Sequence, residues 1–535
     1  MSENSHSGEY THRQILTILS GLMMGMFLGA LDQTIVSTSI RTIADDLGGL
    51  SVQAWVTTAY LITSTITTPI YGKLGDNYGR KKLFMFAITV FIIGSALCSF
   101  ATSMYQLAAF RAFQGLGAGG LFTLVLAIIG DIVSPRERAR YTGYFMAMFG
   151  TSSVLGPLIG GFFAGQAVIL GIDGWRWVFL VNVPIGIAAL AVVYRTLHIH
   201  HTPRHIRIDW WGAISLVVCL VPLLTVAEQG RQWGWDSPRS LACYVIGAIG
   251  LVAFLLAERA MGAAALIPLR IFRLRPAAVT IAASVLVGVA MFGGIMLIPQ
   301  YMQIVHGASP TEAGLLMLPM VVGMMVGSIG SGQVISRTGH IRWFPIVGSA
   351  VMVVGLLLLS RCGADTPMIW VSLSMLVLGL GLGNCLQPIL LIVQSSVPPT
   401  EIGVATSSAT FFRQIGGTLG VAVFLSVLFS TLGGNVQDEL VTASQTPEWQ
   451  QAVAEGHVFD PSTIAQVQDD SSFIEELPPV FAHPFQVGFA ESMDLVFLIA
   501  AGVGVIAFLI LLLLPPVELR ATSASVAARA EADAS

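Results

Sequence analysis

Long apolar runs separated by short polar segments fill the chain from residue 15 to residue 514. An apolar run of about 20 residues is long enough to cross a bilayer as a helix. On that rule the pattern predicts fourteen membrane-spanning helices and therefore an all-α polytopic membrane protein. Their ranges are 15–40, 54–73, 83–101, 105–131, 141–165, 176–195, 210–228, 240–258, 276–303, 312–335, 344–361, 368–394, 403–431 and 489–514.

One polar segment between these runs recurs in the second half of the chain. The sequence GKLGDNYGRKKL at residues 72–83 is answered by GQVISRTGHIR at residues 332–342, with Gly72 matching Gly332 and Gly79 matching Gly339. The glycines that recur at a similar offset are Gly115, Gly117 and Gly119, matched by Gly379, Gly381 and Gly383. Because internal repeats of helices are typical of secondary transporters, the pattern predicts two six-helix bundles, 15–195 and 276–514, with an extra helix pair at 210–258.

Composition supports a membrane location and excludes several other classes of protein. The chain is 54% hydrophobic and only 10% charged, with a net charge of −4 and a mean hydropathy of +0.78. A soluble chain of 535 residues would carry far more charge, and nothing here favours nucleic acid as a partner. The five cysteines are scattered through apolar runs, which indicates neither a disulfide framework nor a metal site. No phosphate-binding or zinc-hydrolase motif occurs, so we expect no cofactor and no enzyme activity.

The basic residues predict how the chain sits in the membrane. Lys and Arg favour cytoplasmic loops, and most of the 26 in this chain fall on one side if the N-terminus is inside. The segments 1–14 and 515–535 are then cytoplasmic, in a plasma (inner) membrane. The predicted loop at 432–488 carries many acidic residues and no Lys or Arg, so we expect it outside, with little core of its own.

Two charged residues lie inside predicted spans of the first bundle. A charge within a membrane helix is costly, and it marks a proton or substrate path by default. At 1.5 Å per residue, Asp32 lies about 12 Å below the outer surface and Arg111 about 9 Å below it. The two side chains could share a cavity in which protonation of Asp32 responds to what else enters. The alternative is that they only join helices, or that Asp32 is hydrated in the outer mouth.

Other candidate residues carry several interpretations. Asp76 and Arg80, in the segment that also holds Gly72 and Gly79, could pair across a helical turn, or Asp76 could cap a neighbouring helix. Gly156, Pro157, Gly160 and Gly161 place small residues and a helix-bending proline on the fifth helix, which favours close packing. Arg413 and Gln414, with Gln387, could line a substrate cavity, where Arg413 would bind an anionic group or stabilise the interface between the bundles.

The chain resembles the fourteen-helix drug:proton antiporter branch of the major facilitator superfamily. The segments that carry the resemblance are GKLGDNYGRKKL, LDQTIVSTSI at 31–40, RAFQGLGAGG at 111–120, LGPLIGG at 155–161 and WRWVFLVNVPIG at 175–186. The resemblance implies proton translocation at Asp32 and Arg111, and a conformational latch in the first segment. It associates the Gly156–Gly161 motif with antiporters. Ser152, where another Gly is usual, departs from the pattern.

These observations together favour a secondary active transporter that exports amphipathic, cationic compounds in exchange for protons by alternating access. Its partners would be a small amphipathic molecule, protons and the lipid bilayer, and we expect a monomer. One alternative is an exporter of a single endogenous lipid, siderophore or metabolite. Another is a membrane sensor that binds a ligand without transporting it.

Overall fold

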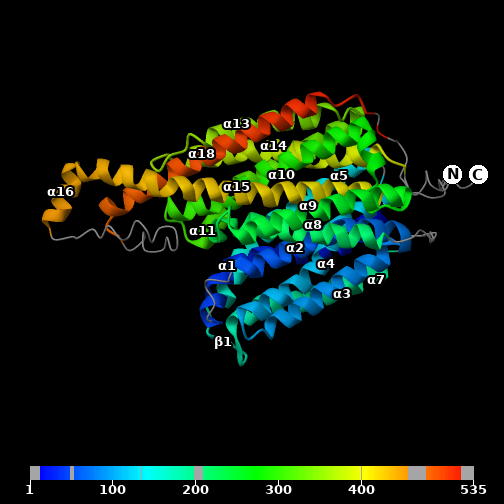
Figure 1. The fold of residues 1–535 in the computed structure, drawn as a ribbon, viewed down its shortest axis with the longest axis horizontal. Helices are drawn as coiled ribbons and strands as arrows, with labels where there is room; N and C mark the ends of the chain where they lie inside the picture. The colour runs from blue at the N-terminus through cyan, green and yellow to red at the C-terminus, as the bar shows by residue number, and fades with distance from the viewer. Residues whose placement is uncertain are drawn as a thin grey trace, which may run out of the picture.

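The computed structural model describes residues 12–47, 54–133, 135–197, 209–398, 401–455, 477–517 and 519. The described residues are almost entirely helical, arranged as long rods that lie roughly side by side (Figure 1). This agrees with the predicted all-α polytopic fold. The predicted cytoplasmic segments 1–14 and 515–535 lie mostly outside the described residues.

The first bundle takes up the chain as far as Thr196. Its helices are α1 (His12–Asp46), α2 (Ala54–Tyr78), α3 (Arg80–Ser99), α4 (Met104–Ile132), α5 (Pro135–Ala164), α6 (Trp177–Leu180) and α7 (Asn182–Thr196). Between α5 and α6 lie the strands β1 (Val168–Ile169) and β2 (Ile172–Asp173) and a short 3₁₀ turn, Gly174–Arg176. The two strands pair antiparallel around Leu170 and Gly171, whose positive φ values of 51° and 78° suit a tight hairpin turn.

The extra pair and the second bundle follow in the predicted order. The pair is α8 (Trp210–Trp233) and α9 (Pro238–Met261), and two 3₁₀ turns, Gly262–Ala264 and Leu269–Arg273, lead away from it. The second bundle holds α10 (Arg275–Ile304), α11 (Pro310–Leu316), α12 (Leu318–Thr338), α13 (Trp343–Leu359), α14 (Met368–Ser395), α15 (Ile402–Ser444), α16 (Pro447–Ala454) and α18 (Pro479–Leu512).

The glycines of the predicted repeat occupy equivalent positions in the two bundles. A Cβ atom at any of them would collide with a neighbouring helix, so they set how closely α4 and α14 pack. Those that face α2 and α12 are Gly115, Gly119, Gly379 and Gly383; those that face α3 and α13 are Gly117 and Gly381. Gly79 and Gly339 end α2 and α12 with positive φ values of 95° and 73°, which suit glycine. The predicted correspondence between the halves is confirmed at these positions.

A helix overlaps each of the fourteen predicted spans. Within the described residues, eleven helices are long and apolar enough to cross a membrane. Two shorter apolar helices, Gly150–Ala164 and Trp343–Leu359, cover two further predicted spans. The remaining one is α2, whose C-terminal end carries Lys73 and Asp76. The number of actual membrane crossings therefore stays a prediction.

The segment predicted as an external loop at 432–488 is partly helical. Helix α15 continues to Ser444, α16 follows it, and α18 begins at Pro479. Trp449 of α16 packs edge-on against Phe481 of α18, with ring centroids 4.5 Å apart. Buried apolar positions at Val436 and Leu440 continue the core of the second bundle into this region. Residues 456–476 of the range lie outside the described residues.

The two bundles meet along α2 and α15 and along α5 and α12. At the first contact, Thr68 donates a hydrogen bond to Gln414 at 3.2 Å, and Gly72 leaves room for Ser407. The extra pair packs over the same junction, because Leu216 and Leu220 of α8 share an apolar cluster with Ile66 of α2 and Phe411 of α15. The extra helices therefore touch both bundles.

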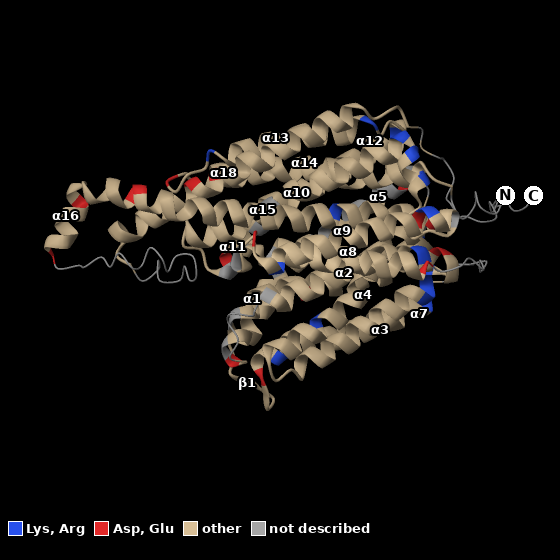
Figure 2. Cartoon of the chain, viewed as in Figure 1, with Lys and Arg blue, Asp and Glu red and all other residues tan. Residues whose placement is uncertain are grey.

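Charge is distributed unevenly along the helices. Figure 2 shows Lys and Arg gathered mainly at one end of the molecule, where α2, α7, α9 and α12 end, while acidic side chains mark α16 and the β hairpin at the other end. Basic residues favour the cytoplasmic side, and which side of the membrane this end faces stays a prediction.

Candidate functional site

A buried ion pair joins two helices inside the first bundle. Arg111 of α4 donates to the Asp32 carboxylate of α1 at 2.6 Å. Asp32 is fully buried and Arg111 is 1% exposed, so water does not screen the pair. Sequence analysis predicted similar depths for the two residues, and the structure brings them into direct contact. Neither residue lies in a hydrated outer mouth.

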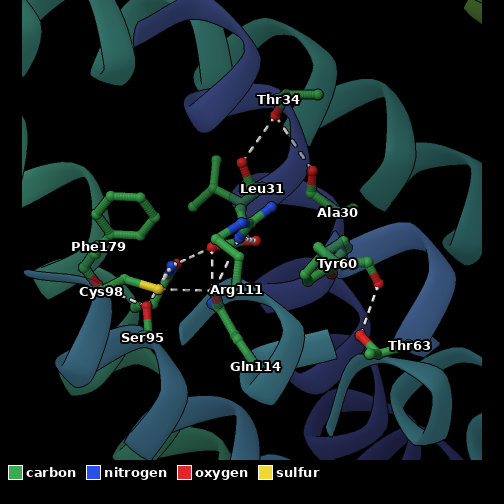
Figure 3. Close-up of polar contacts among 12 residues, drawn as sticks. Ala30, Leu31, Thr34, Tyr60, Thr63, Ser95, Cys98, Arg111, Gln114 and Phe179 are labelled. Atoms are coloured by element: carbon green, nitrogen blue, oxygen red, sulfur yellow. Dashed lines mark hydrogen bonds and ion pairs between the residues drawn. The ribbon is translucent and has the colours of Figure 1, made fainter. Parts of the chain in front are cut away.

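Further donors surround the Asp32 carboxylate. Gln114 Nε2 and Asn182 Nδ2 donate to its Oδ1 at 2.9 and 2.8 Å, and Arg111 also donates to Gln114 at 2.8 Å. The Tyr60 ring lies 4.1 Å from the guanidinium carbon of Arg111, within the range of a cation–π contact. Figure 3 shows Ser95, Cys98, Arg111 and Gln114 converging inside the bundle, with Tyr60 beside Arg111. The network thus connects α1, α2, α3, α4 and α7.

Sequence reasoning missed Gln114 and Asn182 as partners of Asp32. Both are neutral residues, so neither stands out in an apolar run as a charge does. Gln114 lies three residues after Arg111, which places it on the same face of α4. Asn182 begins α7 and is completely buried, where it also donates to Ser95 at 3.0 Å. The signal that the sequence offers is weaker, a single amide in an otherwise apolar run.

A second charged cluster lies where α2 meets α3 and α15. The Asp76 carboxylate pairs with Arg80 at 2.8 Å and accepts a hydrogen bond from the Val404 N–H at 2.9 Å. Val404 lies in the first turn of α15, where the helix dipole favours an anion. Arg80 also pairs with Asp131 of α4 at 2.8 Å. Both interpretations of Asp76, pairing and capping, therefore hold at once, and the cap belongs to the other bundle.

The small residues of α5 pack against α1. A Cβ at Gly156 would collide with Thr34, and one at Gly160 would crowd the backbone at Ile35. Thr34 donates to the Ser152 carbonyl and Ser39 to the Gly160 carbonyl, each at 3.1 Å. Pro157 lies inside the helix between these contacts. Gly161 differs, because no atom of the described residues lies within 4 Å of a Cβ there, and it makes no close packing contact with them.

We expect Gly156→Ala to destabilise the protein by about 1–3 kcal/mol, because the added methyl group must push Thr34 away. Thermal unfolding in detergent measures the effect. Gly161→Ala is the matched control in the same helix and should stay within about 0.5 kcal/mol of the parent protein. Equal losses in the two variants would contradict close packing at Gly156.

The three predicted cavity residues do not form one cluster of contacts. Gln414 accepts the hydrogen bond from Thr68 across the bundle junction. Arg413 and Gln387 are partly buried, and neither forms a hydrogen bond or ion pair with the described residues. The Arg413 backbone packs directly against Gly288 of α10, which anchors this part of α15 to the second bundle.

Two repeated helical bundles, with a buried ion pair in one and charged contacts between them, define a polytopic membrane protein of the transporter class. The profile of the Major Facilitator Superfamily matches residues 22–421. The chain belongs to that superfamily. It is therefore a membrane transporter for small molecules and not an enzyme.

Relatives and solved structures agree with this assignment. The chain is 36% identical over 438 residues to the multidrug transporter protein MdtP of Bacillus subtilis, covering 82% of this chain and 79% of that protein. It is 34% identical over 484 residues to multidrug resistance protein 3 of the same organism, covering 90% and 92%. The proton:xylose symporter XylE shares the fold, with a TM-score of 0.59, 16% identity and coverage of 97% and 100%.

Proposed function

We propose that this transporter exports amphipathic, cationic compounds from the cytoplasm in exchange for protons, with Asp32 as the proton-binding group. The observation that carries the proposal is the fully buried Asp32 carboxylate, held by Arg111, Gln114 and Asn182. An ionisable residue in that position is costly to keep, so a role in ion movement is the default reading. The names of the similar Bacillus subtilis proteins support multidrug export.

Proton binding would act through the helices that the network connects. A proton on Asp32 removes the negative charge that attracts Arg111 of α4. The carboxyl oxygen that carries the proton can no longer accept the hydrogen bond that it accepts in the ionised form. Hydrogen bonds to charged groups contribute about 1.5–3 kcal/mol each, so the change is large enough to alter how α1 sits against α4 and α7. Binding of a cationic substrate would favour the ionised form by the same electrostatics.

The Asp76 cluster would hold the cytoplasmic side closed during the outward-facing part of the cycle. Its contact with the N-terminus of α15 crosses from one bundle to the other, as does the contact of Thr68 with Gln414. Alternating access would then rock residues 15–195 against 276–514, in the plasma membrane with both termini cytoplasmic.

Inside-out membrane vesicles test the proposal, with ethidium as the lipophilic cation. An acid-interior proton gradient should drive ethidium accumulation, and a protonophore should abolish it. Asp32→Asn should reduce gradient-driven uptake at least tenfold, because the amide cannot exchange a proton. Asp365→Asn, which changes an exposed aspartate between α13 and α14, is the matched control and should transport normally. Gradient-driven uptake that survives in Asp32→Asn would rule out the role of Asp32.

A further inference from the structure

A cavity opens beside α18 at the end of the molecule away from the gathered Lys and Arg. Its volume is about 810 Å³, a size typical of small-molecule sites. One wall is the segment that joins α13 to α14, residues 360–367, and the other is α18 between Val487 and Leu498. Helix α13 starts directly after Arg342, at the basic end in Figure 2, so the segment that follows α13 lies at the opposite end.

The joining segment is held in place from inside the second bundle. Tyr301 of α10 is only 2% exposed, and its hydroxyl lies 2.9 and 3.1 Å from the carbonyl oxygens of Cys362 and Gly363, to which it donates. Cys362 itself is buried in the core of this bundle. The wall that the segment forms is therefore fixed in the protein alone, which favours binding because the wall need not be ordered by the ligand.

Three charged side chains that line the cavity have no partner among the described residues. Arg361 comes from the joining segment, and Glu491 and Asp494 come from α18. Asp494 Oδ1 is buried and accepts no hydrogen bond from the described residues. A buried carboxylate oxygen without a donor is costly, so a ligand that brings an N–H or O–H donor would be favoured there. The remaining charged residue of the lining, Asp365, is mostly exposed and contacts His483 at 3.2 Å.

The wall that α18 contributes changes from carboxyl groups to leucines along the helix. Asp494 lies three residues after Glu491. Leu495 and Leu498 follow four and seven residues after Glu491, on the same face, and they are 39% and 51% exposed. Trp370, in the first turn of α14 just after the joining segment, is 61% exposed, as is typical of tryptophan at the level of lipid headgroups. The cavity therefore lies where headgroups give way to acyl chains.

We propose that this cavity binds one phospholipid whose headgroup carries a primary ammonium group. The ammonium group donates to Asp494 and lies near Glu491, while Arg361 binds the phosphate. The acyl chains lie along Leu495 and Leu498. A quaternary ammonium headgroup has the same charge but no N–H, so it cannot donate to the buried Asp494 oxygen. A lipid fits better than a soluble amine, because the exposed leucines continue from the cavity along the outside of the bundle.

Native mass spectrometry of the delipidated full chain tests the site, with phosphatidylethanolamine and phosphatidylcholine of identical acyl chains as probes. We expect phosphatidylethanolamine to bind about tenfold more tightly, because only its headgroup brings an N–H donor to a charged oxygen. Asp494→Asn should lower that ratio toward one. Arg361→Met should weaken both lipids by a similar factor, because both carry the phosphate. Phosphoethanolamine, the same headgroup without acyl chains, should not compete at equal concentration.

Asp236→Asn is the control, because it changes an exposed aspartate in the turn between α8 and α9, and it should leave the ratio unchanged. Equal binding of the two lipids by the parent protein would overturn the proposal, as would a ratio that survives in Asp494→Asn or competition by phosphoethanolamine. If Asp494→Asn does not fold, Glu491→Gln decides, because Glu491 is exposed: a lower ratio supports the site and an unchanged one contradicts it. The measurement involves no transport, so its outcome is independent of the role of Asp32.

Discussion

Arg111→Met should destabilise the protein by about 3–5 kcal/mol, which is the usual cost of removing one partner of a buried ion pair. The variant leaves Asp32 fully buried with two amide donors and no cation. The buried carboxylate then has no positive charge to offset the cost of its burial. Thermal unfolding of the variant in detergent, compared with the parent protein, measures the loss.

A second substitution identifies the cause of that loss. The double variant Asp32→Asn, Arg111→Met has no buried charge left at this position, so it should recover most of the stability. It should still fail to couple ethidium transport to protons. Arg413→Met is the matched control, because Arg413 forms no ion pair with the described residues and its removal leaves no carboxylate unpaired. A double variant as unstable as Arg111→Met would show that the pair does not explain the loss.

The charged parts of the site were predictable from the sequence, because a charge in an apolar run is conspicuous and costly. Asp32 and Arg111 lie in different helices, and counting residues from the helix ends placed them at similar depths. To predict the direct contact, one must also know how each helix is oriented about its own axis. That orientation is determined by how the neutral side chains of the bundle pack. Gln114 and Asn182, which donate to Asp32, are neutral and so do not stand out in the sequence as charged residues do.

The fold was predictable where the same feature occurs twice. Gly79 and Gly339, which match in the sequence repeat, end corresponding helices, since a positive φ favours glycine in both. The region after residue 431 has no counterpart in the first half, and its acidic composition resembles that of a loop. Buried positions such as Leu432, Val436 and Leu440 nevertheless recur with helical spacing. Their pattern, more than the charge count, was the useful evidence.

The junction of the extra pair shows a different limit. Ile66 of α2 and Leu216 of α8 are 150 positions apart, and nothing in the spacing of either residue indicates the other. Their proximity follows from apolar packing between α2 and α8. Tertiary packing of lipid-facing helices has weak sequence specificity, because the same apolar residues suit lipid and protein neighbours.

Asp76→Ala should open the contact between the bundles at the C-terminal end of α2. It removes the carboxylate that binds both Arg80 and the Val404 N–H. Hydrogen bonds to a charged group contribute about 1.5–3 kcal/mol, so the balance between closed and open forms should shift by roughly ten- to a hundredfold. A reporter cysteine at Ser407, which is buried against Gly72, should then react faster with a maleimide when the native cysteines are replaced.

The repeat supplies the control for this experiment. Ser336 occupies the position in the second bundle that Asp76 occupies in the first, and among the described residues its hydroxyl donates to the Gln333 carbonyl of its own helix. Ser336→Ala removes a polar group at the equivalent site without breaking a contact between bundles, so reporter labelling should not change. If both variants label at the parent rate, Asp76 does not hold the cytoplasmic side closed. If only Asp76→Ala labels faster, the difference between the two halves is due to the Asp76 carboxylate, which binds the first turn of α15.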